Sequence, residues 1–347
     1  MSEMSVLNLQ EKVTPSHLIP TRQGETGITA TVINGPLFIL APPRSFTSVV
    51  GTMLGQHPQL HGLPEVHLFS DELIAEWWHR VARSTYPMAD GLLRAVAQLC
   101  FGEQTETTVK KANGWLRRRS HFSTGLILEM LAAKAHPLIL VDKSPSTVHR
   151  VEWMQRVYNF FPQAKFIHLL RHPRGHGESV MKYINDRVQY GPVPRWLLYL
   201  ASFPNPFSGA DETRHGAHVV DPQRGWYVLN TNICQFLKSV PDEQKMQIRG
   251  EDLLTNPDQG LRRIADWLGL RTDDKAIKEM KHPEHSPYAC YGPPGARYGN
   301  DAFFLKSPEL RPSRAEPQTL DGPLSWRDDG YGFVPEVKEL AQQFGYQ

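Results

Sequence analysis

A short apolar run, residues 37–41, is the feature that most limits the fold of this chain, because it ends directly at two prolines. A continuous apolar run of this length is typical of a strand that is buried on both faces of a parallel sheet. Residues 44–48 (Arg-Ser-Phe-Thr-Ser) follow the prolines, and apolar residues then recur at helical spacing over 49–54 until Pro58. The segment therefore predicts a strand, a loop and a helix, which is the start of a βα unit.

Further strands and helices alternate along the chain. Short apolar runs at 138–141 and 166–170, and a weaker run at 246–249, predict three more strands. Residues 71–135 show helical periodicity throughout, and residues 257–268 form a helix that follows an Asn at its N-cap and ends at a Gly. This alternation predicts an α/β fold with a parallel sheet flanked by helices and right-handed crossovers.

Domain organisation follows from the segments that lack this alternation. We expect residues 1–35, which show no sustained periodicity, to form an N-terminal arm, and residues 36–347 to form a single domain with a helical insertion at 71–135. Residues 201–225 and 281–323 are rich in Pro, Gly, Asn and charged residues, and the loops that we expect around them span 181–225 and 281–323. Loops of this length are usually functional lids or disordered. Because both contain aromatic residues, we expect lids that pack over a ligand.

The composition limits the partners and the compartment. A formal net charge of +2 is too small for a general attraction to nucleic acid or to a membrane surface, so any anion site must be local. The three cysteines lie far apart without a CxxC motif, which argues against a disulfide framework or a zinc site. Residues 1–23 lack a signal-peptide pattern, and no apolar run reaches the ~18 residues that span a bilayer. We expect a cytoplasmic protein without a nucleic-acid or membrane partner.

The loop after the first strand has the chemistry of an anion site. It places Arg44 and the hydroxyl groups of Ser45, Thr47 and Ser48 at the N-terminus of the expected helix. Such a terminus binds phosphate or sulfate through unpaired N–H groups and the positive end of the helix dipole. The alternative is an ordinary N-cap made by Ser45 or Thr47 beside an exposed arginine. The loop matches neither G-x-x-x-x-G-K-[ST] nor G-x-G-x-x-G, which argues against a kinase, an NTPase or a dinucleotide site.

Five segments, 40–49, 64–69, 141–145, 166–179 and 248–254, carry a resemblance to a known family. Together they resemble enzymes that use 3′-phosphoadenosine 5′-phosphosulfate (PAPS), the PAPS-dependent sulfotransferases. The first is similar to the family's 5′-phosphosulfate loop, commonly P-[KR]-S-G-[ST]-[ST], and the fourth to its 3′-phosphate site. The others are similar to a Glu-bearing segment, a Lys-[ST]-Pro segment and a Glu-Asp-Leu element. The order and spacing closely resemble the sulfotransferase domains of cyanobacterial polyketide synthases, which act on carrier-bound β-hydroxyacyl chains.

The resemblance implies the sulfotransferase fold and a role for each candidate residue. The residues that it assigns to PAPS are Arg44, Ser45, Phe46, Thr47 and Ser48 at the phosphosulfate, with Arg171 and Ser179 at the 3′-phosphate. Lys143 would lie near the bridging oxygen and the transferring group. Phe46 departs from the pattern, because most members have a Gly that permits positive φ or a close approach. Its presence implies either an ordinary φ or a ring turned toward the adenine or the acceptor.

Two residues are candidates for the base that accepts the acceptor's proton. Glu65 and His67 lie two positions apart, so their side chains share one face if the segment is extended. The resemblance favours Glu65, whereas His67, with an ordinary pKa of about 6.5, suits a cytoplasmic pH. The structural alternatives are a helix-capping carboxylate at Glu65 and a packed imidazole that binds a backbone carbonyl at His67.

The predicted reaction is transfer of a sulfuryl group to a hydroxyl. It resembles phosphoryl transfer, in which positioning and electrostatics supply most of the catalysis. Because a sulfuryl group carries less charge than a phosphoryl group, cationic side chains suffice and we expect no metal. We expect a bacterial enzyme of secondary metabolism that sulfates a small-molecule or carrier-bound acyl acceptor and releases 3′-phosphoadenosine 5′-phosphate (PAP). The alternatives are a carbohydrate or aryl sulfotransferase and a PAPS- or PAP-binding protein without turnover.

Overall fold

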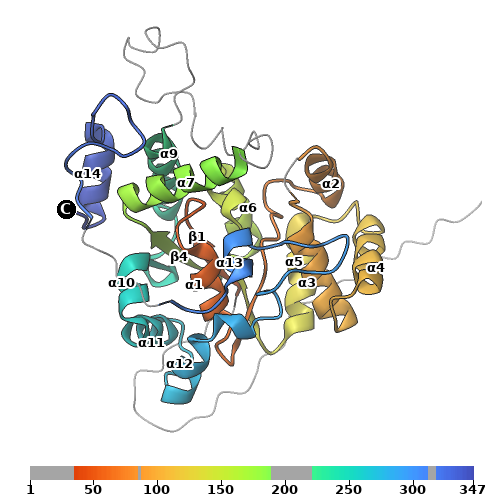
Figure 1. Ribbon diagram of the computed structural model, residues 1–347. Coiled ribbons are helices and arrows are strands. Elements are labelled where there is room, and N and C mark those ends of the chain that lie inside the picture. The colour runs from red at the N-terminus through yellow and green to blue at the C-terminus, as the bar shows by residue number, and fades with distance from the viewer. Residues whose placement is uncertain (1–34, 85–86, 189–220, 312–317) are drawn as a thin grey trace, which may run out of the picture.

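The computed structural model describes residues 35–84, 87–188, 221–311 and 318–347 (Figure 1). The arm expected over 1–35 lies outside this part of the chain except for Gly35, and so does the stretch 189–220 of the predicted lid 181–225. The two ends of that lid are helical, because residues 181–188 belong to α7 (Pro173–Val188) and α9 (Pro222–Leu237) begins directly after Asp221. The prediction of a loop was therefore wrong at both ends of this segment.

Five strands form one parallel sheet, as the alternation of strands and helices predicted. They are β1 (Leu37–Leu40), β2 (Leu60–Gly62), β3 (Ile139–Asp142), β4 (Lys165–Leu170) and β5 (Lys245–Arg249). Their order is β2-β3-β1-β4-β5, and every neighbouring pair is parallel. Four strands confirm predicted runs. The fifth, β2, was not predicted, because its three residues, Leu-His-Gly, form no apolar run.

Helices cover both faces of the sheet. They are α1 (Thr47–Leu54), α2 (Ile74–Ala82), α3 (Asp90–Phe101), α4 (Glu106–Arg117), α5 (Thr124–Ala135), α6 (Val151–Phe160), α10 (Gly250–Thr255), α11 (Pro257–Trp267), α12 (Asp274–Met280), α13 (Ala302–Lys306) and α14 (Pro335–Gln343), besides α7 and α9. Figure 1 shows α2–α5 gathered on one flank and α10–α12 on the other. In the described part of the chain, no helix combines the length and the apolar character needed to cross a membrane.

Strand β1 is buried on both faces because its side chains alternate between two hydrophobic cores. Phe38 and Leu40 belong to the core that holds α2–α6, whereas Leu37 and Ile39 belong to the core that holds α1 and α11. All four side chains are buried, and full burial of a side chain of this size contributes about 1.5–3 kcal/mol. The continuous apolar run at the start of the domain is therefore the pattern of a central strand.

The segment 71–135, expected to be a helical insertion, contains the helices α2–α5. Two of these helices begin at side-chain caps, because Thr105 accepts a hydrogen bond from the Thr108 amide and Ser123 accepts one from the Leu126 amide. Helix α11 begins after Asn256, as predicted, but the Asn256 side chain donates to Gln259 and does not cap the helix. The helix ends before Gly269, whose φ of 70° is left-handed.

The predicted lid 281–323 contains short helices and is tied to the insertion by a buried arginine. Arg94 of α3 is fully buried, and it donates to the carbonyls of Cys290 and Tyr298 at 2.9 and 2.7 Å. Within the segment lies α13, whose N-cap is Asp301. In the described part of the lid, this anchoring fixes the loop before α13 against the helical insertion.

The strand order reverses at β1, and this reversal positions the polar residues. The chain passes from β1 to β2 and β3 on one side of β1, then to β4 and β5 on the other. A reversal of this kind opens a crevice at the carboxyl ends of the strands, where α/β proteins bind ligands. Four charged residues lie at this edge, each after a different strand: Arg44 follows β1, Glu65 follows β2, Lys143 follows β3 and Arg171 follows β4.

Gly91 in α3 allows two backbones to touch beside this edge. A Cβ atom at Gly91 would lie 1.9 Å from the Glu65 carbonyl oxygen. We expect Gly91→Ala to lower the free energy of unfolding by about 1–3 kcal/mol, as forced overpacking does. Gly114→Ala in α4 is the matched control, because its Cβ would meet only the flexible Arg118 side chain at 3.3 Å. It should be neutral or stabilising by about 0.5–1 kcal/mol. Urea unfolding measures the free energy of unfolding of both variants, and equal values for the two would contradict the prediction.

Candidate active site

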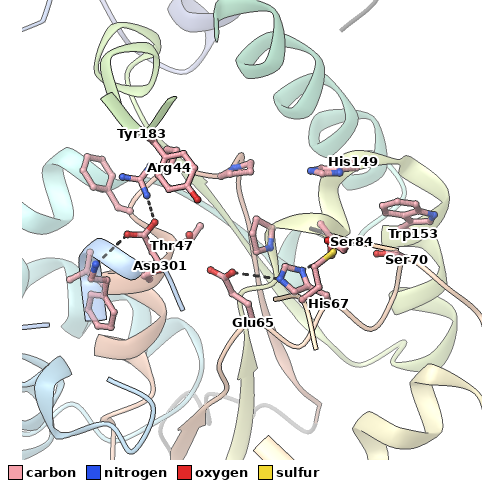
Figure 2. A pocket seen from close by; sticks show the side chains of 18 of the residues that line it. Arg44, Thr47, Glu65, His67, Ser70, Ser84, His149, Trp153, Tyr183 and Asp301 are labelled. Atoms are coloured by element: carbon pink, nitrogen blue, oxygen red, sulfur yellow. Dashed lines mark hydrogen bonds and ion pairs between the residues drawn. The ribbon is translucent and has the colours of Figure 1, made fainter. Parts of the chain in front are cut away.

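A cavity of about 550 Å³ lies at the carboxyl ends of the strands, and Figure 2 shows side chains that line it. In this view Arg44 and Asp301 lie at one end, His149 and Trp153 at the other, and Glu65 between them. The predicted site residues that line the cavity are Arg44, Phe46, Thr47, Ser48, Glu65, His67 and Arg171. The predicted residues Ser45, Lys143 and Ser179 lie behind this lining, in contact with it or next to it in the chain.

Residues 44–48, called the anion loop below, run from the end of β1 into the first turn of α1, and Phe46 is the N-cap residue of that helix. Its φ of 62° and ψ of 8° are left-handed, and in the described structure no side chain caps this helix. The alternative of an N-cap made by Ser45 or Thr47 was therefore wrong, and so was the ordinary φ at Phe46. The Ser45 hydroxyl is buried without a hydrogen-bond partner in the described structure. The first-turn N–H groups of α1 have no intrahelical acceptors, so this corner offers donors to an anion.

Arg44 is held from several sides and is not the exposed arginine of the alternative interpretation. Its backbone φ of 69° is also left-handed. Its Nε donates to Ser179 Oγ of α7 at 3.2 Å, and its Nη1 pairs with Asp301 at the start of α13. The rings of Tyr183 and Phe303 lie 5.2 and 5.6 Å from its guanidinium carbon. Arg44 therefore joins the anion loop to α7 and to the lid.

Arg171 lies beside the same loop, at the end of β4. Its Nη1 donates to the Arg44 carbonyl at 2.6 Å, and its guanidinium stacks on the Phe46 ring at 4.4 Å. Its Nε is buried without a partner in the described structure, and burial lowers the pKa of Arg171 to about 10. The structure thus brings Arg44, Arg171 and Ser179 together, although Ser179 contacts Arg44 and no hydrogen bond joins it to Arg171 among the described contacts.

Glu65 and Lys143 form a buried ion pair next to the loop. Lys143 Nζ lies 3.0 Å from Glu65 Oε1 and 3.4 Å from Ser48 Oγ, and only 1% of its side chain is exposed. His67 Nε2 lies 3.6 Å from the other Glu65 oxygen. The alternative of Glu65 as a helix cap was wrong, because its carboxylate binds Lys143. The two base candidates lie close together, although the extended backbone on which their common face was predicted is absent at His67.

His67 reaches this position through a left-handed backbone and not through a simple extended segment. Its φ is 51°, and the Ser144 hydroxyl accepts the backbone N–H groups of Val66 and His67, both at 3.0 Å. Ser144 in turn donates to Asp142 at 2.7 Å. The His67 ring contacts the Ser146 hydroxyl at 2.9 Å, not a backbone carbonyl. The alternative of a packed imidazole was therefore wrong about the partner of the ring, which is a hydroxyl and not a carbonyl.

The charges of this cluster follow from opposing effects. Burial raises the pKa of Glu65, but the Lys143 ammonium and the His67 ring outweigh burial and lower it to about 2. Glu65 is therefore an ionised carboxylate in the folded protein. Farther along the cavity, burial lowers the pKa of His149 to about 4, with a smaller effect from nearby His67 and Arg80. His149 is therefore neutral near pH 7.

Sequence reasoning did not find the apolar side chains of the lining, which lie at both ends of the cavity: Tyr183 packs over Arg44, and Trp153 lies at the opposite end (Figure 2). Side chains of this kind are Val49, Met88, Pro145, Trp153, Tyr183 and Phe304. Asp301, which pairs with Arg44, was missed as well, although it lies in the predicted lid 281–323. Ser144 and Ser146 lay within or beside a segment that carried the family resemblance. For these two serines the signal was position in or next to a recognised motif, and not residue type.

The chain belongs to the sulfotransferase family. The family profile, described as Sulfotransferase family, matches residues 36–274. The sulfotransferase domain from the curacin biosynthetic pathway is similar in structure, with a TM-score of 0.64 and 22% identity over 91% of this chain and 99% of that chain. The sulfotransferase domain of the Synechococcus PCC 7002 olefin synthase has a TM-score of 0.64 and 24% identity over 94% and 99%. A comparison with curated protein sequences gives no match. The expected sulfotransferase fold is confirmed.

The Glu65 ion pair predicts a specific pH dependence of stability. The pKa of Glu65 in the folded protein is lowered from 4.5 to about 2, so ionised Glu65 stabilises the fold above about pH 4.5. This stabilisation is lost as the pH falls toward about 2. Glu65→Gln should therefore be much less stable than the wild type at pH 6, and the difference should shrink by pH 3. Chemical unfolding at both values measures it.

Glu106→Gln provides the control for this measurement. Glu106 forms an exposed pair with Lys110 on α4, and exposed pairs of this kind contribute little to stability because solvent screens them. The free energy of unfolding of Glu106→Gln should differ little from that of the wild type at pH 6 and at pH 3. A Glu65→Gln difference that stays constant between these values would contradict the assigned pKa.

Proposed function

We propose that this chain is a PAPS-dependent O-sulfotransferase that transfers a sulfuryl group to a hydroxyl and releases PAP. The observation that carries the proposal is the convergence of Arg44 and Arg171 at the N-terminus of α1, beside the buried pair of Lys143 and Glu65. Two buried donors in this corner, Ser45 Oγ and Arg171 Nε, have no partner among the described residues. A polyanion supplies the acceptors that such donors need.

The proposed binding mode divides the two anionic ends of PAPS between two groups of residues. Residues 44–48 and the first turn of α1 bind the 5′-phosphosulfate through side chains and backbone N–H groups. Arg171 binds the 3′-phosphate together with Ser179, whose hydroxyl lies on α7 next to Arg44. To bind PAPS, Arg44 exchanges its partner Asp301 for the anion, because both compete for the same guanidinium.

In the proposed step, the oxygen of the acceptor hydroxyl bonds to sulfur while the bond between sulfur and the bridging oxygen breaks. Glu65 accepts the hydroxyl proton, and Arg44 and Lys143 neutralise the charge that develops on the departing phosphate of PAP. Lys143 exchanges Glu65 for this charge. Because burial alone raises the pKa of Glu65, loss of its ion pair makes it a stronger base as the step proceeds. These cationic groups suffice without a metal.

The proposed acceptor is a hydroxylated small molecule or an acyl chain on a carrier protein, made in bacterial secondary metabolism. The apolar side chains of the cavity lining, among them Met88, Trp153 and Phe304, support a chain or ring with few polar groups. This favours an acyl or aryl acceptor over a carbohydrate, whose many hydroxyls need polar partners. The three cysteines are free, in keeping with a cytoplasmic location.

A turnover assay tests the proposed function. The protein is incubated with labelled PAPS and a panel of hydroxylated acceptors that includes a carrier-bound β-hydroxyacyl chain, with and without a chelator. We expect label on an acceptor, an equal amount of PAP, and the same rate with the chelator. PAP-binding without transfer to any acceptor would favour a binding protein, and loss of activity on chelation would contradict the metal-free mechanism.

The identity of the base is tested with one good acceptor. We expect Glu65→Gln to lower kcat by about 10²–10⁴-fold, the usual contribution of a general base. His67→Asn should have a smaller effect, because the His67 ring contacts Glu65 and Ser146 and only supports the carboxylate. Steady-state rates of both variants and of the control Glu106→Gln decide the question. Full activity in Glu65→Gln, or a larger loss in His67→Asn, would assign the base to His67.

A further inference from the structure

Phe46 occupies a backbone conformation that its side chain disfavours. Its φ of 62° is left-handed, and a residue with a side chain pays about 1–2 kcal/mol for this conformation, which costs glycine almost nothing. The loop keeps a phenylalanine here, so interactions of the ring must offset this cost. The contacts of the ring therefore indicate what the residue does.

The ring contacts a glycine and an arginine. It packs against Gly250 at the start of α10, where a Cβ atom would lie only 2.3 Å from Phe46 Cδ2. The Arg171 guanidinium lies over the ring, with its central carbon 4.4 Å from the ring centre. The residue at 250 leaves just enough room for the ring, and the ring in turn supports the guanidinium.

This stacking leaves the edge of the guanidinium available for hydrogen bonds. A ring contacts the flat face of the group, whereas the N–H donors point outward in its plane. One donor, Nη1, binds the Arg44 carbonyl at 2.6 Å, and another, Nε, is buried without a partner among the described residues. The backbone of Arg171 is fixed as well, because its carbonyl accepts from Trp226 Nε1 at 2.9 Å. The guanidinium is therefore held with a free donor.

We propose that Phe46 is a positioning residue, which holds the Arg171 guanidinium by stacking so that its free donor meets the 3′-phosphate of the nucleotide. The proposal rests on the PAPS site proposed above and adds to it a residue that sets the affinity for one phosphate. It also predicts how the glycine common in the family would change nucleotide binding at this position. Replacing Phe46 by the glycine common in the family should weaken nucleotide binding, although it removes the backbone strain.

The test compares two nucleotides that differ only in the 3′-phosphate. Calorimetry gives the Kd of the full chain for PAP and for adenosine 5′-monophosphate, and their ratio reports the contribution of that phosphate. We expect Phe46→Leu and Phe46→Gly to lower this ratio by about five- to tenfold, the size of a partly desolvated cation–π contact. Phe46→Tyr, which keeps the ring face, should preserve the ratio. Gly250→Ala should lower the ratio as well, because the new methyl group displaces the Phe46 ring.

Phe303→Leu is the matched control. Phe303 also lies over an arginine, but that arginine is Arg44 in the phosphosulfate loop. Its loss should change the Kd of both nucleotides by the same factor and leave the ratio unchanged. An unaltered ratio in Phe46→Leu and Gly250→Ala, or equal weakening of both nucleotides, would overturn the role of Phe46 while the proposed function stands. A wild-type protein that does not prefer PAP would overturn both the PAPS site and this inference.

Discussion

The buried ion pair of Lys143 and Glu65 is the interaction on which the rest of the site depends. It joins the segment after β2 to the end of β3, and Lys143 reaches it by crossing α1 where Gly51 leaves room, since a Cβ there would lie 2.7 Å from Lys143 Cγ. Removal of one partner from a buried pair typically costs about 3–5 kcal/mol, because the other charge stays buried. In the proposed function the same two charges take part in the transfer step, so stability and that function would share them.

Strain is concentrated around this pair and the anion loop. Arg44, Phe46 and His67 are the non-glycine residues with positive φ in the described structure, and all three line the cavity. Strained backbone persists only where the surroundings fix it, and it gathers at functional sites. Here the surroundings are identifiable: Arg171 and Gly250 hold Phe46, and the Ser144 hydroxyl holds the backbone at His67. The cavity is thus shaped by contacts between segments distant in sequence.

Much of this arrangement could be predicted, and the failures have physical reasons. Continuous apolar runs predicted β1, β3 and β4, because burial leaves a strong pattern. The edge strand β5, which has no buried residue, was predicted from a weaker run. Strand β2 left no such pattern, since three residues of mixed polarity carry too little signal. The candidate residues after β1, β3 and β4 were found through motifs that sit at strand ends. Asp301 escaped prediction because its contact with Arg44 depends on how the lid folds back, which no local pattern encodes.

The sequence by itself determined the α/β class, and through the family resemblance it selected residues 44–48 and the charged candidates at the strand ends. The class follows from local rules, because burial patterns and helix termini act over a few neighbours. Only the tertiary structure decided which charges meet: Lys143 with Glu65, Arg44 with Asp301 and Ser179, and Arg171 with the ring of Phe46. The parallel sheet brings these groups together, because its strand order reverses at β1 and the segments after β1, β2, β3 and β4 meet at one cavity.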